Sequence, residues 1–456
     1  MLIPKLKPIG TIITLCIVSL LSPVSYFSTH SHAVGASPAI SSQTPPAIKL
    51  ALPVPSGPFA VGRITYHWTD SSRPEPFSLH MGAHREVMVY VWYPAAKSKV
   101  AGQTAPYLPD FSAAQNVVRE ADLKSMFRPT PYSIIQQSGL PLTHTVEKTK
   151  ISSSTIRYPV LVFSHGWGNT TLLYTAELED LASHGYVVAA IDHPYDTTFT
   201  IFPGPRVVVF AQEKFDTETK KPNGYIDYAK ERVEVMATDT RFVIDKLTQY
   251  DKNASLGAPF AGHLDLRRVG SFGHSIGGVA AVRACQIDKR LRACMNQDSD
   301  VDDGAPFILT TSAGKSLDQP LLFFAVNGDK FGQRVVNPTD EQLVQMKLTR
   351  AEYNTIILQQ QKNQNEVLAS VRGGSYRVTL IDRPGISHRS FSDLTLMVVT
   401  GDATKVADSL RNYQIIQSYT RAFFDKYLKG QKDSLLDQKS SLDPLVRIDR
   451  FSPAAQ

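Results

Sequence analysis

The chain contains the hexapeptide Gly273-His-Ser-Ile-Gly-Gly278, in which a serine stands between glycines. A short apolar run of strand character precedes it at residues 268–272, and small, helix-compatible residues follow it at residues 279–285. The pattern G-x-S-x-G between a strand and a helix is typical of a nucleophile elbow, a strained turn that exposes the serine hydroxyl. Glycines two residues before and after the serine leave room for the strand to pack closely against the helix. The hexapeptide therefore predicts Ser275 as the nucleophile of a serine ester hydrolase.

Strand-like and helix-like segments alternate around this hexapeptide. We expect strands at residues 61–68, 87–93, 158–164, 186–191, 269–273, 293–297, 321–326 and 376–381. We expect helices at residues 172–183, 225–250, 277–287, 342–372 and 403–428. Such alternation predicts an α/β-hydrolase fold, a mostly parallel sheet of about eight strands with helices on both faces.

Residues 1–36 have the features of a secretory signal peptide. Lys5 and Lys7 precede an apolar core at residues 9–21, and small residues near Ala36 offer a cleavage site. The apolar core is shorter than an ordinary membrane span, although an uncleaved anchor stays an alternative. We therefore expect a secreted or periplasmic protein.

The remainder of the chain fits one domain with additions. Residues 37–58 are rich in proline and serine, which predicts a linker. We expect a single α/β-hydrolase domain over residues 59–430 and a C-terminal tail over residues 431–456. Insertions near residues 94–157 and 330–373 interrupt the minimal pattern. We expect them to roof the active site or lie beside it, with surface additions of no function as the alternative.

The composition limits the partners and cofactors. Removal of the signal peptide would take away two lysines and no acidic residue, which lowers the formal net charge from +6 to about +4. Lysines and arginines are spread along the chain, so we expect no nucleic-acid partner and at most a weak contact with a membrane or lipid surface. The sequence has no H-E-x-x-H motif, and we expect no metal and no other cofactor.

Two cysteines remain after the signal peptide, Cys285 and Cys294. An oxidising compartment would permit a disulfide between them. Cys285 belongs to the helix expected after the hexapeptide, and Cys294 belongs to the next strand. Because they lie in different elements, we expect buried free thiols instead of a disulfide.

His388 is the expected catalytic base. Acyl transfer by a serine needs a base that takes its proton, an acid that orients the base, and donors that stabilise the developing oxyanion. In the α/β-hydrolase fold these residues follow in the order serine, acid, histidine. His388 is the only one of the twelve histidines that follows Ser275, and it lies in a loop directly after the strand expected at residues 376–381. This position is where the fold places the base.

The residues alone leave two candidates for the acid. Asp298 follows the strand expected at residues 293–297, and Asp329 follows the strand expected at residues 321–326. Both strand ends face the same edge of a parallel sheet, and many hydrolases of this fold use the second position, which favours Asp329. Three further aspartates are expected to form a solvated acidic loop: Asp300, Asp302 and Asp303.

Two backbone amides are expected to form the oxyanion hole. Ile276, directly after the serine, supplies the first. The segment at residues 163–168 supplies the second, because Gly166 and Gly168 let the backbone curl so that the amide of Trp167 points inward. We expect His165 in this segment to be structural.

Five segments of the chain carry a family resemblance. They are Val91-Trp-Tyr-Pro94, Tyr158-Pro-Val-Leu-Val-Phe-Ser-His-Gly-Trp-Gly168, Leu181-Ala-Ser-His-Gly-Tyr-Val-Val-Ala-Ala-Ile-Asp-His193, Gly273-His-Ser-Ile-Gly-Gly278 and His388-Arg-Ser-Phe-Ser-Asp393. Together they resemble the secreted platelet-activating factor acetylhydrolase family, the lipoprotein-associated phospholipases. The likeness covers about residues 85 to 400, and the elbow and the histidine loop are its most specific parts.

The resemblance implies a site and a chemistry. It implies Ser275 as nucleophile, His388 as base, and Trp167 and Ile276 as the oxyanion amides. It also implies Asp298 as the acid, because this family takes the acid from the end of the strand just after the elbow helix. It further implies calcium-independent hydrolysis of short or oxidised acyl chains from phospholipids.

We therefore expect serine-dependent hydrolysis of a carboxylic ester through an acyl-enzyme, on short-chain or acetylated lipid esters. The same apparatus could act on another ester, such as an aromatic or polymeric polyester, with Trp167 stacking on an aromatic acyl group. A non-catalytic, lipid-binding relative that kept the fold is the second alternative.

Overall fold

The structure of the protein is a computed structural model. It describes residues 51–78, 80–96, 104–125, 130–147, 149–154, 157–204, 206–222, 224–299, 317–327, 339–345, 348–381, 383–398, 402–432, 434–438 and 443–452. The expected signal peptide, most of the expected linker and the expected acidic loop lie outside these residues.

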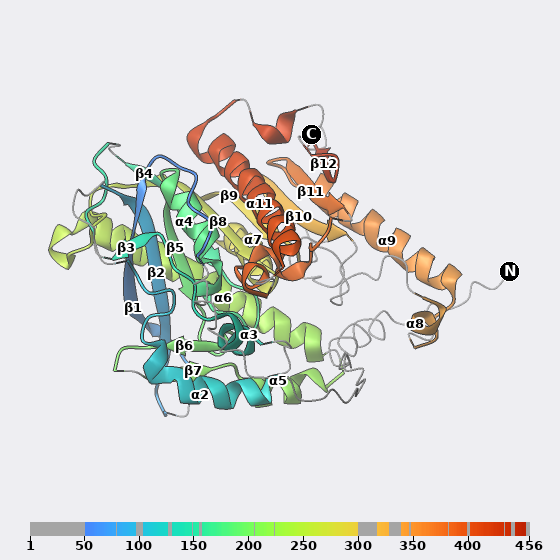
Figure 1. Cartoon of the computed structure of the whole chain (residues 1–456), viewed down its shortest axis with the longest axis horizontal. Coiled ribbons are helices and arrows are strands. Elements are labelled where there is room, and N and C mark those ends of the chain that lie inside the picture. Colours follow the sequence, from blue (N-terminus) through green and yellow to red (C-terminus); the bar gives the residue numbers. More distant parts are fainter. Residues whose placement is uncertain are drawn as a thin grey trace, which may run out of the picture.

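A ten-stranded mixed sheet forms the centre of the protein (Figure 1). Its strands are β1 (Ala60–Pro74), β2 (His84–Ala95), β3 (Thr145–Glu147), β4 (Tyr158–Ser164), β5 (Val187–Asp192), β8 (Leu264–His274), β9 (Leu291–Gln297), β10 (Leu321–Asn327), β11 (Ser375–Ile381) and β12 (Val446–Phe451). Their order across the sheet is β12-β11-β10-β9-β8-β4-β5-β2-β1-β3. The six strands from β11 to β5 are parallel to one another, whereas β12 and β2 run antiparallel to their neighbours. The expected mostly parallel sheet is confirmed, with β3 and β12 added at its two edges.

Alternating apolar side chains give the sheet two buried faces. In β4, Val160 and Val162 lie in one hydrophobic core, while Leu161 and Phe163 lie in the other. Successive side chains of a strand point to opposite faces of the sheet, and all four of these side chains are fully buried. Both faces of the sheet therefore need a cover.

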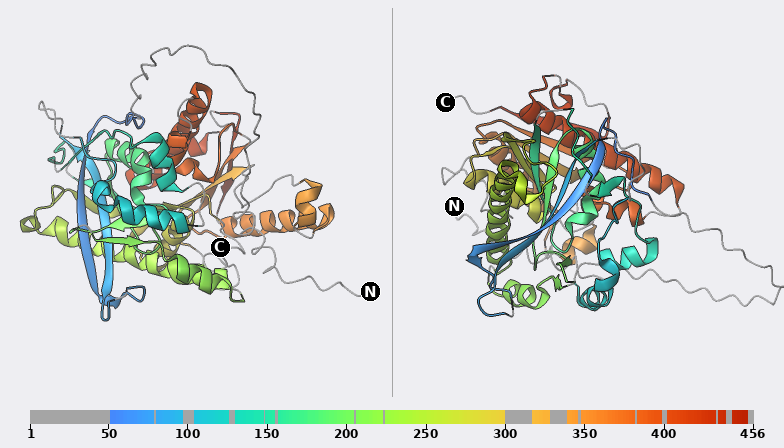
Figure 2. Two further views of the ribbon diagram at one scale, coloured as in Figure 1. Left: turned by 60° about the horizontal axis from the view of Figure 1, so that its bottom comes forward. Right: turned by 90° about the vertical axis from the view of Figure 1, so that its left-hand side faces the viewer.

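Helices supply the cover on both sides (Figure 2). The core around Leu161 includes residues of α4 (Thr175–Ser183) and α11 (Ala403–Lys429), and the core around Val160 includes residues of α6 (Gly224–Lys252) and α7 (Ile276–Ile287). The predicted α/β-hydrolase architecture is thus confirmed. Of the helices in the described part of the chain, none is both long and apolar enough to cross a membrane.

Smaller elements surround this framework. The two insertions contribute α2 (Phe111–Lys124), α3 (Pro131–Ser138), α8 (Asp340–Gln345) and α9 (Arg350–Ala369). Figures 1 and 2 show α8 and the first turns of α9 projecting beyond the sheet. The remaining elements are β6 (Phe199–Ile201), β7 (Val207–Val209), α5 (Gln212–Thr219), α10 (Leu394–Val398), η1 (Thr171–Tyr174), η2 (Ala254–Leu256), η4 (His388–Phe391) and η5 (Leu435–Asp437).

Two segments differ from the expectation. The single helix expected at residues 342–372 is wrong, because α8 and α9 are separate helices. Thr349 starts α9 with a capping box: its hydroxyl accepts the N–H of Glu352 at 3.2 Å, and the Glu352 carboxylate accepts the N–H of Thr349 at 2.8 Å. The segment that we set apart as a C-terminal tail contributes β12, which pairs along β11.

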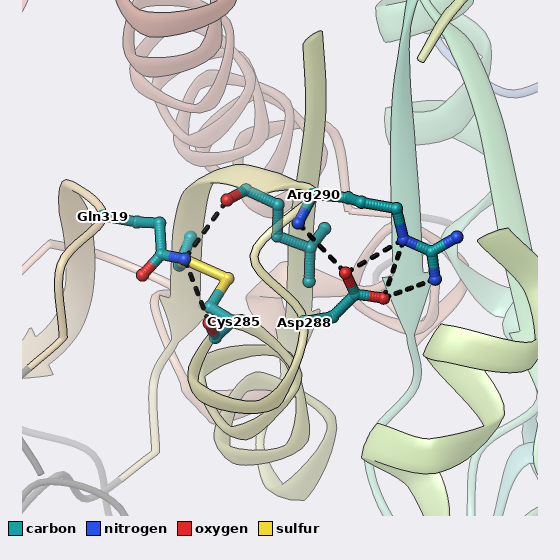
Figure 3. The surroundings of a disulfide bond; sticks show 6 residues. Cys285, Asp288, Arg290 and Gln319 are labelled. Carbon is teal, nitrogen blue, oxygen red and sulfur yellow. Dashed lines mark hydrogen bonds and ion pairs between the residues drawn. A yellow bond between two sulfur atoms is a disulfide. The ribbon is translucent and has the colours of Figure 1, made fainter. Parts of the chain in front are cut away.

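A disulfide joins Cys285 to Cys294, so the expectation of free thiols is wrong (Figure 3). Cys285 lies near the end of α7, and the chain turns back at once into β9, which carries Cys294. Their Cα atoms are 6.5 Å apart, within the range that a disulfide can span. The Gln319 amide also ties the two elements, since it donates to the carbonyl oxygens of Cys285 at 3.0 Å and of Leu291 at 3.2 Å. The helix that follows Ser275 is therefore covalently fixed to the strand that leads to Asp298.

Candidate active site

Ser275 lies at the sharp turn between β8 and α7. Its φ of 55° and ψ of −132° fall in a region that residues other than glycine rarely adopt. The backbone of the turn is anchored to β9, because the N–H of Ser275 donates to the carbonyl oxygen of Gln297 at 2.9 Å. A Cβ atom at Gly273 would overlap the carbonyl oxygen of Gly277, and one at Gly277 would overlap that of Ser164. The glycines around the serine are thus required by the close packing of β8, α7 and β4.

The structure brings Asp298 and His388 together. The Nδ1 atom of His388 lies 2.8 Å from the Oδ2 atom of Asp298. Asp298 directly follows β9 and has a φ of 58°. Its Oδ1 atom accepts the N–H of Val326 at 2.9 Å, and its own N–H donates to the carbonyl oxygen of Phe324 at 3.1 Å. These contacts with β10 hold the carboxylate, so that its second oxygen faces the imidazole.

The ring of His388 lies beside the elbow. Its centroid is 4.4 Å from that of His274, the residue before Ser275. His274 also stacks on Phe391 of η4 at 5.5 Å, and its Nδ1 atom lies 2.9 Å from the Tyr174 hydroxyl. Burial, followed by the nearby His388, lowers the pKa of His274 well below its ordinary value, so this ring is neutral at pH 7. A neutral, buried imidazole therefore joins η4 to the elbow.

The segment after β4 lies against the nucleophile. A Cβ atom on Gly166 would lie 3.1 Å from the Cβ of Ser275 and 3.0 Å from the Nδ1 atom of His274. Gly168, two residues further on, has a φ of 66°. In the described part of the chain, no group accepts a hydrogen bond from the backbone N–H of Trp167 or of Ile276. Uncommitted amides beside a nucleophile are what an oxyanion hole requires.

His165 fixes the start of this segment. Its Nδ1 atom lies 2.8 Å from the carbonyl oxygen of Gly166, and its Nε2 atom accepts the N–H of His193 at 3.1 Å. The ring is fully buried, and burial together with His193 lowers the pKa of His165 to about 3. The imidazole is therefore neutral, and its contacts join the segments after β4 and β5.

A second serine–histidine–aspartate series lies behind this segment. The Oγ atom of Ser164 is 3.1 Å from the Nε2 atom of His193, whose Nδ1 atom is 2.8 Å from the Oδ2 atom of Asp239. Asp239 is also bound by Arg85 at 2.6 Å and by Arg73 at 2.7 Å. Ser164, His193 and Asp239 are each at most 1% exposed. An ester cannot reach Ser164, so this series is structural.

Sequence reasoning missed several polar partners of the site. His274 stands within the elbow motif, at a position that the motif leaves open, whereas Tyr174 and Val326 belong to no motif. The alternative acid Asp329 lies outside the described residues. No group of three or more His, Cys, Asp or Glu side chains in the described ranges is placed to hold a metal ion.

The parallel sheet with an elbow at the end of β8 defines an α/β-hydrolase of the esterase type. A solved structure supports this class: the ferulic acid esterase from Streptomyces cinnamoneus superimposes with a TM-score of 0.63 at 25% sequence identity, covering 88% of this chain and 99% of that chain. The model of the family "Platelet-activating factor acetylhydrolase, isoform II" matches residues 47–442. The chain belongs to that family of serine esterases, which confirms the resemblance seen in the sequence.

Individual relatives are distant. A probable 1-alkyl-2-acetylglycerophosphocholine esterase of Arthroderma benhamiae is 26% identical over 276 residues, which make up 59% of this chain and 64% of that protein. The platelet-activating factor acetylhydrolase of Bos taurus is 24% identical over 317 residues, 63% of this chain and 60% of that protein. The chain thus spans less than two thirds of the length of these relatives.

Proposed function

We propose that the protein is a serine esterase that hydrolyses short-chain or acetylated lipid esters through an acyl-enzyme on Ser275. The observation that carries this proposal is the 2.8 Å contact between His388 Nδ1 and Asp298 Oδ2, beside a strained serine elbow. A carboxylate on Nδ1 selects the imidazole tautomer whose Nε2 atom can take a proton. No comparable constraint is needed for a protein that only binds lipid.

The reaction runs in two halves. His388 takes the hydroxyl proton of Ser275 as the oxygen attacks the ester carbonyl, and the amides of Trp167 and Ile276 stabilise the oxyanion. His388 then gives the proton to the leaving alcohol, which departs and leaves the acyl group on Ser275. In the second half, His388 takes a proton from water as the water attacks the acyl-enzyme. His388 then gives that proton to the Ser275 oxygen as its bond to the acyl carbon breaks, which releases the acid and restores the free serine. Asp298 stabilises the imidazolium in both halves.

The family supports an acetylated lipid ester as the substrate. The Arthroderma and bovine relatives are named for the hydrolysis of acetylated glycerophosphocholine and of platelet-activating factor.

An aromatic ester is the second candidate. The indole of Trp167 is half-buried and packs against Phe215, Tyr225 and Tyr228, with ring centroids 5.5 to 5.9 Å away. An aromatic surface next to a proposed oxyanion amide suits an aromatic acyl group, and the matching solved structure is named a ferulic acid esterase.

Steady-state kinetics with three esters test the proposal: nitrophenyl acetate, an alkyl-acetyl-glycerophosphocholine and methyl ferulate. We expect the acetylated phospholipid to have the larger kcat/KM, whereas a preference for methyl ferulate would favour the second candidate.

Ser275→Ala should lower kcat on the order of 10⁶-fold, and a fluorophosphonate should label the wild-type protein once, at Ser275. Wild-type turnover in the Ser275→Ala variant would contradict the assignment. A protein that neither turns over these esters nor takes up the label would be the non-catalytic relative.

We also propose that the protein is secreted or periplasmic. The disulfide between Cys285 and Cys294 supports this location, since disulfides persist in oxidising compartments. Fractionation of the producing cells, with N-terminal sequencing of the protein, tests it. A cytosolic protein that keeps Lys5 and Lys7 would contradict the proposed export.

A further inference from the structure

The segment after β5 holds the proposed oxyanion segment at several points. The indole N–H of Trp167 donates to the Oδ1 atom of Asp196 at 3.1 Å. The N–H of Gly168 donates to the carbonyl oxygen of Asp196 at 3.0 Å, and the Thr198 hydroxyl donates to the carbonyl oxygen of Gly168. Asp196 therefore contacts both the side chain of Trp167 and the peptide that follows it.

Asp196 is itself held rigidly. Arg232 of α6 binds both oxygens of its carboxylate: Nε donates to Oδ1 at 3.0 Å and to Oδ2 at 3.2 Å, and Nη2 donates to Oδ2 at 2.7 Å. The N–H of Asp196 donates to the carbonyl oxygen of His193 at 3.0 Å. Asp196 is 0% exposed and Arg232 is 1% exposed. The carboxylate thus has a fixed position relative to both β5 and α6.

A gain in folding stability does not explain the buried ion pair of Asp196 and Arg232 well. Burying two charges costs much of what their attraction returns, so a buried ion pair is weak evidence for a stabilising role. The proposed oxyanion segment has a different need. Gly166 and Gly168 stand on both sides of Trp167, and glycine allows a peptide to adopt many orientations. Within the segment, the Gly166 carbonyl is held by His165 Nδ1 at 2.8 Å and by the Asn169 N–H at 3.1 Å, which orients one end of the peptide that carries the Trp167 N–H. The Trp167 side chain and the peptide that follows it are held from outside the segment, by Asp196.

We propose that Asp196 is a positioning residue of the oxyanion hole. Through the Trp167 indole and the Gly168 amide it holds Trp167 and the peptide that follows it, and so keeps the Trp167 N–H facing the oxyanion. This inference rests on the proposed function.

Two variants test the role of Asp196. Asp196→Asn removes the charge that Arg232 orients, and Trp167→Phe removes the indole donor but keeps an aromatic ring. With nitrophenyl acetate, each should lower kcat about 10- to 100-fold, somewhat less than the loss of a whole oxyanion donor. KM should change by less than about threefold, because the ground state depends little on the oxyanion hole. Affinity for a boronic acid that forms a tetrahedral adduct should fall in proportion to kcat. The double variant should be little worse than either single variant, because both break the same contact.

Asp251→Asn is the matched control. Asp251 is also largely buried, accepts the N–H of Leu264 at 3.0 Å and binds Arg157 at 3.0 Å. Leu264 begins β8 and pairs with Tyr158, whereas Gly273 near the elbow pairs with Ser164, six residues further along β4. The control therefore lies at the far end of the strand, about 20 Å from the elbow. We expect this variant to lose thermal stability while its kcat and boronate affinity stay near the wild-type values.

Each outcome is decisive. The inference is overturned if Asp196→Asn loses no more kcat and boronate affinity than the control, or if Trp167→Phe loses none. If Asp196→Asn does not fold, the kcat and boronate affinity of Trp167→Phe decide. A wild-type protein without esterase activity or fluorophosphonate labelling overturns the proposed function first, whereas an active wild type with unaffected variants overturns only the role of Asp196.

Discussion

Asp298 and His388 are 90 residues apart in the chain, yet Oδ2 of the first lies 2.8 Å from Nδ1 of the second. The other carboxylate oxygen of Asp298 accepts the N–H of Val326, so both oxygens have fixed partners. Asp298 is therefore held with one carboxylate oxygen facing the imidazole.

The first prediction concerns the acid. Asp298→Asn keeps the shape of the side chain but cannot stabilise an imidazolium, so kcat for nitrophenyl acetate should fall about 10³- to 10⁴-fold. Asp329→Asn is the comparison and should stay within about tenfold of the wild-type kcat. A larger loss in Asp329→Asn than in Asp298→Asn would reverse the assignment.

The second prediction separates the two serine–histidine–aspartate series. Ser164→Ala leaves the Nε2 atom of His193 without its partner and should lower the free energy of unfolding by about 1–3 kcal/mol. Because Ser164 is buried, kcat should stay within about tenfold of the wild-type value, and fluorophosphonate labelling should be retained. Chemical denaturation and mass spectrometry of the labelled peptide measure both effects. Loss of labelling in this variant, with Ser275 intact, would mean that Ser164 is the reactive serine.

The third prediction concerns the disulfide. Its two cysteines are nine residues apart, and the loop that it closes should contribute roughly 2–3 kcal/mol to the free energy of unfolding. Reductant should therefore lower the Tm of the wild-type protein. A variant with both Cys285→Ala and Cys294→Ala should have that lower Tm with or without reductant. An unchanged wild-type Tm after complete reduction, verified by thiol alkylation, would show that the cross-link adds no stability.

The fourth prediction concerns pH. Glu177 of α4 is fully buried, and its Oε1 atom accepts hydrogen bonds from Gln297 at 2.8 Å and Thr420 at 3.0 Å. Burial raises the pKa of Glu177 to about 7, despite these hydrogen bonds. Between the ordinary carboxyl pKa and pH 7 the folded protein thus keeps a proton that the unfolded chain loses. The contribution of Glu177 to stability should fall as pH rises through this window, by at most about 1.4 kcal/mol per pH unit.

Urea denaturation of the wild type and of Glu177→Gln at pH 5, 6, 7 and 8 measures this effect. The variant should show a smaller decline of unfolding free energy from pH 5 to pH 7. Asp192, whose pKa burial also raises to about 7, should leave part of the decline in both proteins. Parallel pH profiles for the two proteins would rule out the proposed titration of Glu177.

The fold could be predicted because its strands are short apolar runs that stand between helical segments. Ser275 could be singled out because the elbow needs glycines at fixed spacing. His388 could be singled out because no other histidine follows Ser275 in the sequence. The disulfide could not be foreseen from the positions of its cysteines, since it depends on how α7 packs on β9. Asp196 could not be recognised from the sequence, because its partners lie in separate segments of the chain and form no local motif. The break before α9 was foreseeable, because Thr349 and Glu352 have the spacing of a capping box.

β12 has a consequence for the solubility of shortened forms. It covers the outer backbone groups of β11, the strand that leads toward His388. A chain that ends before residue 446 would present those N–H and C=O groups as an open edge, on which a strand of another molecule can add. Truncated forms should therefore aggregate, even though every residue of the candidate active site is still present.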